Sequence, residues 1–466
     1  MKLPKLKPLP PYRARDFPEP QPFLKMIGPA FFMAGFAVGA GELISIPRAT
    51  LLFGPDILWI MLLACVLQAF INLEIVRYTL VTGESFQLGA SRLWRPAGIM
   101  WGIANILNWI WGNIYAYSTG AALALIFGGP VPAWVAFCYL IIVAIVLAPK
   151  WIYYAVEKLL MVCVFAAVLA SAVIAAIIGS IHPSYAIEAL VGNVKFGVIP
   201  RAVDPFVLIG AAAAAGAGGT GNLWYSYITR ERGYGMGGAI VGRIMGLRGK
   251  IEPYAESGFM PEPTEENIRR FKGWWSVAKK DQLCWFLMTY AGILLFAVAI
   301  YSGLKPLGKV PAGLGLLLEE GKIFELVIGP VGIPLFIAIA CIWLWSTQIA
   351  VIDCFARMNS DVLYTHFERA RRYSIRTWYY IWIAVIVGFG LAIIPLGTPE
   401  VVMNLFLAIL GLTMPFYGAF LIVMNNKLLP KPYRPSIICN IAMVAFTIFF
   451  SVMTAAVVGP MLVPRR

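Results

Sequence analysis

A carboxylate and a group of small residues interrupt the first long apolar stretch of the sequence. Residues 35–54 read GFAVGAGELISIPRATLLFG, in which Glu42 directly follows Gly39, Ala40 and Gly41. Glycine weakens a helix, and a carboxylate near the centre of a bilayer costs roughly 2.5 kcal/mol or more. A membrane helix that carries both is expected to do so at a site that binds a cation or a polar solute.

A second apolar stretch has the same character. Residues 203–229 begin with Asp204 and Pro205, a favourable helix start, and place Asn222 directly after a run of glycines. These glycines are Gly216, Gly218, Gly219 and Gly221. Two glycine-interrupted segments at equivalent places of two five-helix halves are typical of inverted-repeat transporters, whose unwound carbonyls bind substrate near the midplane. The alternative is that the glycines only allow close helix packing.

Hydroxyl groups form a third polar patch, Ser346 and Thr347, within the apolar run WLWSTQIAVID. If they face the first interrupted stretch, their oxygens suit a sodium ion. The alternative is that both hydroxyls bond back to carbonyls of their own helix. Two charged pairs near helix ends, Glu74 with Arg77 and Asp353 with Arg357, have the spacing of ordinary ion pairs within a helix.

Eleven apolar stretches are long enough to position these residues across a bilayer, since about 20 residues span about 30 Å of hydrocarbon. They are residues 26–53, 57–80, 98–127, 131–149, 151–180, 203–229, 282–303, 324–356, 377–396, 399–424 and 436–459. Only 13% of the residues are charged, against about 25% in soluble domains. The sequence therefore predicts an all-α, polytopic membrane protein in contact with lipid, placed in the plasma membrane.

The basic residues flank the apolar stretches, which accounts for the net charge of +14 without a nucleic-acid partner. Their distribution predicts a cytoplasmic N-terminus and, with eleven spans, an extracellular C-terminus. We expect a disordered tail over residues 1–25, five-helix repeats over 26–180 and 203–424, and a flexible cytoplasmic linker over 230–280. Residues 436–459 form the eleventh helix.

The cysteines and histidines form no metal-binding or redox motif. The seven cysteines lie singly in or beside apolar runs, and His182 and His366 fall in predicted loops far apart in the sequence. No motif of a membrane-embedded transferase is present, so we expect neither enzymatic activity nor a cofactor. The oligomeric state is left open by the sequence.

Several long runs resemble the Nramp family of divalent-metal transporters. GPAFFMAGFAVGAGE resembles the first helix of the family, QAFINLEIVRYTLVTGESF the second, and LAILGLTMPFYGAFLIVMNNKLLP the tenth. GNLWYSY lies where the family has Met-Pro-His-Asn-Leu-Tyr. The resemblance covers most of the chain and implies the leucine-transporter-like fold, with two inverted five-helix repeats, broken helices 1 and 6, and an eleventh helix.

The metal-binding residues of that family are largely replaced here. In the first helix, Gly39 stands at the position of the family's Asp and Glu42 at the position of its Asn. In the sixth helix, Gly219 stands at the position of its Met and Gly221 at that of its His, and the Asn that follows the His is kept as Asn222. A small residue of helix 6 falls on Gly216, and a glutamine of helix 10 falls on Thr413. The resemblance therefore implies a substrate site at Gly39, Ala40, Gly41, Glu42, Gly216, Gly219, Asn222 and Thr413, in which Glu42 and Asn222 are the candidate metal ligands.

An all-oxygen ligand set suits a hard cation such as Mg²⁺ or Mn²⁺ better than a softer transition metal. The leading hypothesis is accordingly a secondary transporter that moves a divalent cation by alternating access. The alternative is a carrier of an amino-acid-like organic solute, with or without sodium, in which Gly39 makes room for the substrate. Glu42 itself is a cation ligand, a carboxylate that stabilises the second half-helix, or a proton-coupling acid.

Overall fold

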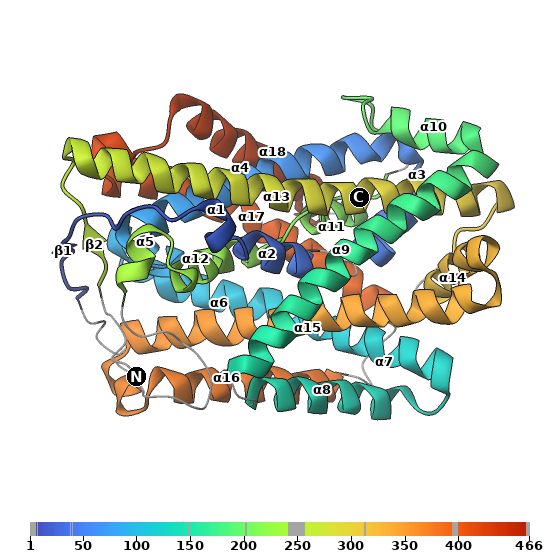
Figure 1. The fold of residues 1–466 in the computed structure, drawn as a ribbon, viewed down its shortest axis with the longest axis horizontal. Coiled ribbons are helices and arrows are strands. Elements are labelled where there is room, and N and C mark those ends of the chain that lie inside the picture. The colour runs from blue at the N-terminus through green and yellow to red at the C-terminus, as the bar shows by residue number, and fades with distance from the viewer. Residues whose placement is uncertain are drawn as a thin grey trace.

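A bundle of long helices forms the described part of the chain, which in this computed structural model comprises residues 6, 8–37, 39, 41–147, 150–200, 203–240, 257–311, 314–393 and 399–462. The long helices are α4 (Leu58–Thr82), α6 (Ala97–Trp109), α7 (Ile114–Phe127), α8 (Val131–Leu147), α9 (Lys150–Ile181), α13 (Glu265–Leu304), α15 (Gly332–His366), α16 (Ile375–Ile393), α17 (Pro399–Leu428) and α18 (Ile437–Leu462). Most of them run along the long axis of the molecule, and α9 crosses them obliquely (Figure 1).

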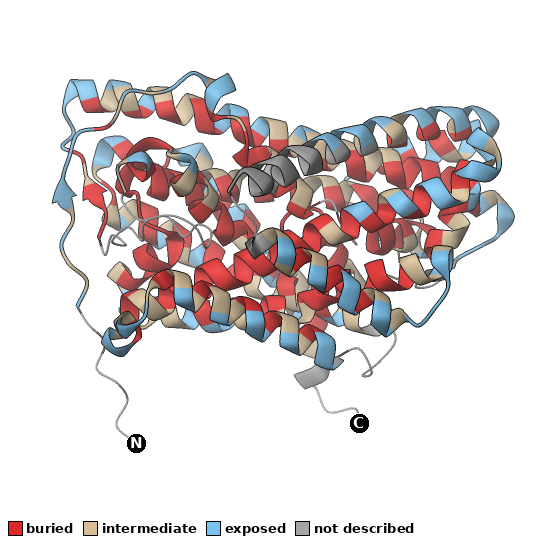
Figure 2. Cartoon of the chain, turned by 60° about the horizontal axis from the view of Figure 1, so that its bottom comes forward, coloured by how far each residue is buried: buried red, intermediate tan, exposed pale blue. Residues whose placement is uncertain are grey.

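Each of the eleven expected stretches contains an apolar helix. Among the described residues, seven helical segments are long and apolar enough to cross a membrane, and four shorter apolar helices account for the remaining stretches. The outer surface has the character of a lipid-facing one, because α18 exposes Ile437, Ile441 and Val452 by 79%, 62% and 63%. Buried residues fill the interior of the bundle (Figure 2). The prediction of a polytopic all-α membrane protein is therefore confirmed.

The first and sixth stretches are interrupted where the glycines predicted. The first consists of α2 (Pro29–Ala37), a π-helical turn η1 (Gly41–Ser45) and α3 (Ile46–Phe53). The sixth consists of α11 (Pro205–Ala214) and α12 (Gly221–Arg232). Helix α2 contacts α12, and α3 and η1 contact α11, so the four half-helices meet in the centre of the bundle (Figure 1).

Shorter elements cover the two ends of the bundle. Helices α10 (Pro183–Gly192) and α14 (Leu314–Ile328) lie at one end, and α14 begins in the connection between the expected stretches 282–303 and 324–356. Helix α5 (Phe86–Leu93) and strands β1 (Arg13–Ala14) and β2 (Phe259–Met260) lie at the other end (Figure 1). We call this second end the β end.

The N-terminal segment is ordered over its described part, so the prediction of a disordered tail over residues 1–25 is wrong there. Strand β1 pairs in parallel with β2, and a short helix α1 (Phe23–Met26) follows. Phe17, between them, is only 1% exposed. The basic, proline-rich composition gives no sign of this order, because the order depends on contacts with residues more than two hundred positions away.

The linker predicted over residues 230–280 is also largely structured. Helix α12 continues to Arg232, a 3-10 turn η4 (Gly235–Ala239) packs against α4, and α13 begins at Glu265. The Thr264 hydroxyl caps α13 by accepting a hydrogen bond from the Asn267 amide at 3.2 Å. Of the predicted linker, only residues 241–256 lie outside the described part of the chain.

Candidate functional site

The break between α11 and α12 exposes backbone groups that a side chain of α4 satisfies. After Ala214 the chain leaves the helix, and Gly218 and Gly219 adopt φ angles of +66° and +47°, which favour glycine. The Gln68 amide donates to the carbonyl of Ala212 at 3.2 Å, and its oxygen accepts from the Gly218 amide at 3.2 Å. Because an unpaired backbone group in a membrane interior is costly, Gln68 stabilises the unwound conformation.

Asparagines of α6 hold the other side of the same break. The Asn108 oxygen accepts hydrogen bonds from the Thr220 amide at 2.8 Å and from the Thr413 hydroxyl at 3.1 Å. The Thr220 hydroxyl donates to the Asn105 oxygen at 3.1 Å and accepts from the Trp109 indole at 2.8 Å. The break is therefore tied to α6 and α17 as well as to α4.

Asn222, at the start of α12, completes this polar ring. Its amide donates to the Gln68 oxygen at 3.2 Å and to the Tyr417 hydroxyl at 2.7 Å. Two fully buried atoms of the ring have no hydrogen-bond partner among the described residues, namely the Asn222 oxygen, an acceptor, and the Asn108 amide nitrogen, a donor. Buried polar groups without partners are rare, and a bound ligand is one explanation for them.

Side chains of neighbouring helices pack directly against the glycines of the break. A Cβ atom at Gly216 would collide with Gln68, one at Gly219 with Asn108, and one at Gly221 would lie 2.5 Å from the Phe36 ring. Gly216 and Gly219 therefore lie where the sequence placed them, at the interruption. In the conformation described, Gln68 and Asn108 occupy the volume that Cβ atoms at these two glycines would need.

The interruption of the first helix faces α15. The Thr347 hydroxyl donates to the Gly35 carbonyl at 3.3 Å, and a Cβ atom at Gly39 would lie 2.7 Å from that hydroxyl oxygen. Ser346 instead donates to the carbonyl of Trp343 in its own helix at 2.7 Å. The Thr347 hydroxyl also lies 3.1 Å from the Trp343 carbonyl of its own helix. Thr347 therefore lies against the first helix and also meets the alternative of a bond within its own helix, whereas Ser346 meets only that alternative.

Gly41 packs against α11, where a Cβ atom would lie 2.6 Å from that of Ala214. The two interruptions are therefore adjacent, as the sequence predicted. Ala40 and the side chain of Glu42 lie outside the described residues. Thr413, from α17, reaches the same region through its bond to Asn108.

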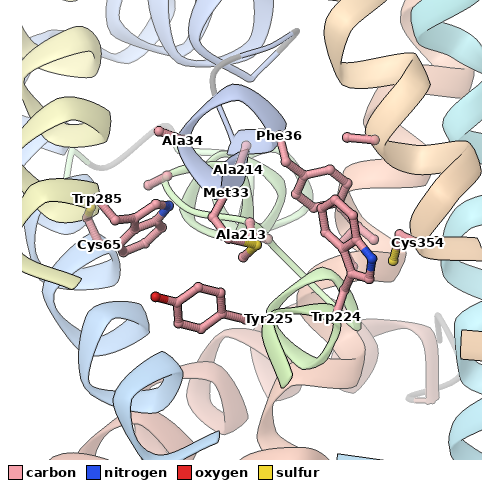
Figure 3. Packing of buried hydrophobic residues seen from close by; sticks show 14 of the residues in the cluster. Met33, Ala34, Phe36, Cys65, Ala213, Ala214, Trp224, Tyr225, Trp285 and Cys354 are labelled. Atoms are coloured by element: carbon pink, nitrogen blue, oxygen red, sulfur yellow. The ribbon is translucent and has the colours of Figure 1, made fainter. Parts of the chain in front are cut away.

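Aromatic rings line the region beside the two breaks. The Phe36 ring on α2 lies 4.9 Å from Trp109 and 5.2 Å from Trp224, measured between ring centroids. Phe406 on α17 lies 5.6 Å from Trp109 and 5.7 Å from Tyr115. Phe36 and Trp224 are seen side by side in Figure 3, next to Ala213 and Ala214 at the end of α11. The site therefore combines neutral amides with aromatic surfaces.

On the side of the site toward the β end, hydrogen bonds from α12 and α13 hold the start of α2 and the residues before it, which the sequence did not indicate. Asp281 on α13 accepts from the Ala30 amide at 3.2 Å and from the Tyr225 hydroxyl. Arg232 donates to the Ile27 carbonyl at 2.9 Å. These contacts join α2 to α12 and α13. In the sequence, Asp281 could have been noticed only as a single carboxylate at the edge of an apolar run.

Two other sets of buried charges form the ion pairs that the sequence predicted. Glu74 and Arg77 lie 2.7 Å apart, and Arg357 donates to Asp353 at 2.9 Å, so both predicted ion pairs are confirmed. His366 is the last residue of α15 and lies 2.7 Å from the Ser91 hydroxyl, not in a loop as the sequence suggested. Within the described ranges, no cluster of three or more histidine, cysteine, aspartate or glutamate side chains is arranged to hold a metal ion.

Comparison with protein-family models and with curated protein sequences finds no match. Solved structures do match. A manganese transporter of Eremococcus coleocola, in complex with an aromatic bis-isothiourea compound, is 13% identical, with a TM-score of 0.68 over 95% of this chain and 89% of that one.

Two further matches are Mhp1, a nucleobase-cation-symport-1 family transporter with bromovinylhydantoin bound, and MhsT in complex with L-phenylalanine. Mhp1 is 14% identical with a TM-score of 0.55 over 95% of this chain and 92% of its own. MhsT is 15% identical with a TM-score of 0.55 over 95% and 100%. At these identities the comparison shows the fold alone, and the chain has the leucine-transporter-like fold with helices 1 and 6 broken.

Proposed function

We propose that the protein is a secondary transporter that moves a small organic solute by alternating access, with the solute bound between the two breaks. The observation that carries this proposal is the pair of partnerless atoms in the polar ring, the acceptor on Asn222 and the donor on Asn108. A ligand with both a donor and an acceptor, such as an amino acid or a cyclic amide, carries the two kinds of group that these atoms lack.

A divalent cation fits these two atoms less well. Mg²⁺ and Mn²⁺ take oxygen ligands, and the Asn108 nitrogen presents hydrogens that repel a cation. The aromatic surfaces of Phe36, Trp109 and Trp224 also match the general composition of small-molecule sites, which are mostly apolar with a few placed polar groups. The ligands named for Mhp1 and MhsT combine a ring with hydrogen-bonding groups, which is the same chemistry.

Cation transport is the second candidate. It is favoured by the free acceptor on Asn222, by the position of Glu42 in η1 and by the fold shared with the manganese transporter. In that case the substrate would be Mg²⁺ or Mn²⁺, with Asn222 as one ligand. For coupling, the placement of the Thr347 hydroxyl against the Gly35 carbonyl supports a sodium ion at this point of helix 1.

A thermal-shift screen of the purified protein separates the two candidates. The panel consists of the common L-amino acids, nucleobases and hydantoins, against MgCl2 and MnCl2 at fixed ionic strength. A ligand present at 100 times its Kd stabilises the native state by about 2.7 kcal/mol, which is well above the resolution of the method. We expect one of the organic compounds to raise Tm. We also expect proteoliposomes that contain the protein to take up that compound. If only MnCl2 or MgCl2 stabilises the protein, the proposal of an organic solute is refuted and cation transport is favoured.

A further inference from the structure

Glu320 is a completely buried carboxylic acid that the proposed site does not use. It lies on α14, in the segment that connects α13 to α15, and its side chain is 0% exposed. Neither of its carboxyl oxygens has a hydrogen-bond partner among the described residues. Carboxyl groups in protein interiors are otherwise paired or hydrogen bonded.

The face of α14 that carries Glu320 is apolar. Leu316, Leu317, Ile323 and Phe324 have the helical spacing that places them beside Glu320, and all are buried. Phe324 packs on Phe336 of α15 with ring centroids 4.6 Å apart. The buried neighbours that α14 itself places beside Glu320 therefore cannot donate a hydrogen bond to it.

The adjacent Glu319 has the opposite environment. Its oxygens lie 2.8 Å from the Lys309 ammonium and 2.6 Å from the Lys322 ammonium, and both lysines are about half exposed. These two lysines are thus engaged at the surface by Glu319. The two glutamates differ by one position and share one helix, which makes Glu319 a matched control.

The elements packed against α14 bring few titratable groups. They are α7, α9, α13, α15, η1 and the 3-10 turn η6 (Gly329–Val331), which carries no titratable residue. Ile323 lies against Gly303 of α13, and Gly321 lies against Ile333 of α15. The titratable residues nearest to these contacts in the sequence are Tyr301 and Cys341, while α7 carries Tyr115 and Tyr117 and η1 carries Glu42. The side chains described on α9 after residue 168 include none, and no described arginine or lysine forms an ion pair with Glu320.

A carboxylate in such an environment loses its hydration without gaining a counter-charge. In that situation the group takes up a proton and is buried as the neutral acid. A sodium or divalent ion would need several oxygen ligands in place of the proton, and the side chains that α14 places beside Glu320 are hydrocarbon. The ligand that suits this position is therefore a proton.

We propose that Glu320 is a proton-binding site. It holds a proton in the conformation described here, and it releases that proton to water when α14 withdraws from the bundle and its carboxyl group becomes hydrated. Because α14 also contacts η1, at the interruption of the first helix, proton binding at Glu320 is linked to the position of the broken helix. That link to transport rests on the proposed function, whereas the binding of the proton does not.

The test compares the pH dependence of Tm for the full-length protein in detergent micelles, between pH 5 and pH 8 at one scan rate, without substrate. The folded state binds the Glu320 proton more tightly than the unfolded state, so its contribution to stability is present at low pH and is lost as pH rises. Each pH unit in that window lowers the folded-to-unfolded ratio up to about tenfold. We expect Glu320→Gln, which mimics the neutral acid, to remove this part of the slope, and Glu319→Gln to retain it.

An unchanged slope in Glu320→Gln, or its loss in Glu319→Gln, would overturn the proposal. If Glu320→Gln does not fold, the infrared band of protonated carboxyl groups provides the second measurement. Glu320→Asp should keep a shifted band near neutral pH, and an unshifted spectrum would count against the site. Neither readout involves solute uptake, so a silent transport assay combined with the expected slope would refute the proposed function and leave the proton site standing.

Discussion

Removing the Phe17 side chain should release the N-terminal segment from the β end of the protein. Phe17 is 1% exposed, and its ring lies 5.9 Å from that of Phe271 and 5.6 Å from that of Tyr433. Its amide donates to the Asn267 side chain at 2.9 Å, and its carbonyl accepts from Arg270 at 2.8 Å. The side chain is thus the apolar anchor of a segment that is otherwise held by hydrogen bonds.

A phenylalanine truncated to alanine in a packed site costs about 3–5 kcal/mol. We take the lower value, about 3 kcal/mol, because the segment lies at the edge of the molecule and can partly collapse onto the space left. This corresponds to an increase of roughly 150-fold in the population of the undocked segment, since 1.4 kcal/mol is a factor of ten. The rest of the bundle should keep its stability.

Hydrogen exchange measured by mass spectrometry reads this population directly. In the wild type, the Arg13 amide donates to the Gly258 carbonyl at 3.1 Å, so peptides that cover residues 8–20 exchange slowly. In Phe17→Ala they should exchange about two orders of magnitude faster, while peptides from α4 and α17 are unchanged. Leu24→Ala is the matched control, because Leu24 lies in the same segment but is 80% exposed.

An increase of less than about fivefold in Phe17→Ala, or an equal increase in Leu24→Ala, would refute the assignment of Phe17 as the anchor. The same segment is fixed at a second point by Glu84, which accepts from the Arg92 guanidinium and the Tyr78 hydroxyl, each at 2.7 Å. The Tyr12 hydroxyl donates to that of Tyr78 at 2.8 Å. Burial, followed by the Glu84 charge, raises the pKa of Tyr12 well above its ordinary range, so this phenol remains protonated.

Three further predictions concern the two breaks and the contacts that hold the start of α2. Asp281→Ala removes the oxygens that accept from the Ala30 amide and the Tyr225 hydroxyl, so a cysteine probe introduced on α2 should be labelled several times faster; an unchanged rate would show that Asp281 does not hold the start of α2. Gly219→Ala places a Cβ atom against Asn108 at a φ of +47°, and should lower the free energy of unfolding by about 1–3 kcal/mol, whereas Gly459→Ala, which has no neighbour within 4 Å, should not. Thr347→Val keeps the shape but removes the hydroxyl at the Gly35 carbonyl, so any sodium dependence of solute binding should disappear, and the same loss in Ser346→Ala would contradict the assignment.

The helices and the two breaks could be predicted from the sequence because both depend on local properties. Hydropathy over about 20 residues identifies a membrane helix, and clustered glycines within it identify an interruption. The first signal identified the seven long and four short apolar helices of the described part of the chain, and the second identified Gly41 and Gly219 at interrupted backbone. Thr347 stands out in the sequence as a hydroxyl in an apolar run, but the same signal marks Ser346, which bonds within its own helix.

The partners of the breaks could not be predicted in the same way. Gln68 and Asn108 lie in other helices, and only the packed structure brings them to the backbone of residues 212–220. A signal was present, because both are amides within long apolar runs, where polar side chains mark functional positions. The ordered N-terminal segment is a stronger case, since the residues that hold Phe17 are about 250 positions away.

The most direct test of the central claim is a calorimetric titration of the most stabilising solute from the thermal-shift panel. Asn108→Asp keeps the oxygen that accepts from Thr220 and Thr413 but removes the partnerless donor. Leaving a polar ligand atom unpaired costs about 1–3 kcal/mol, so we predict a loss of affinity of at least about fivefold. Asn426→Ala, which alters an amide bonded to Asn440 outside the site, should bind as the wild type does. Equal affinity in the wild type and Asn108→Asp would contradict a solute site between the two breaks.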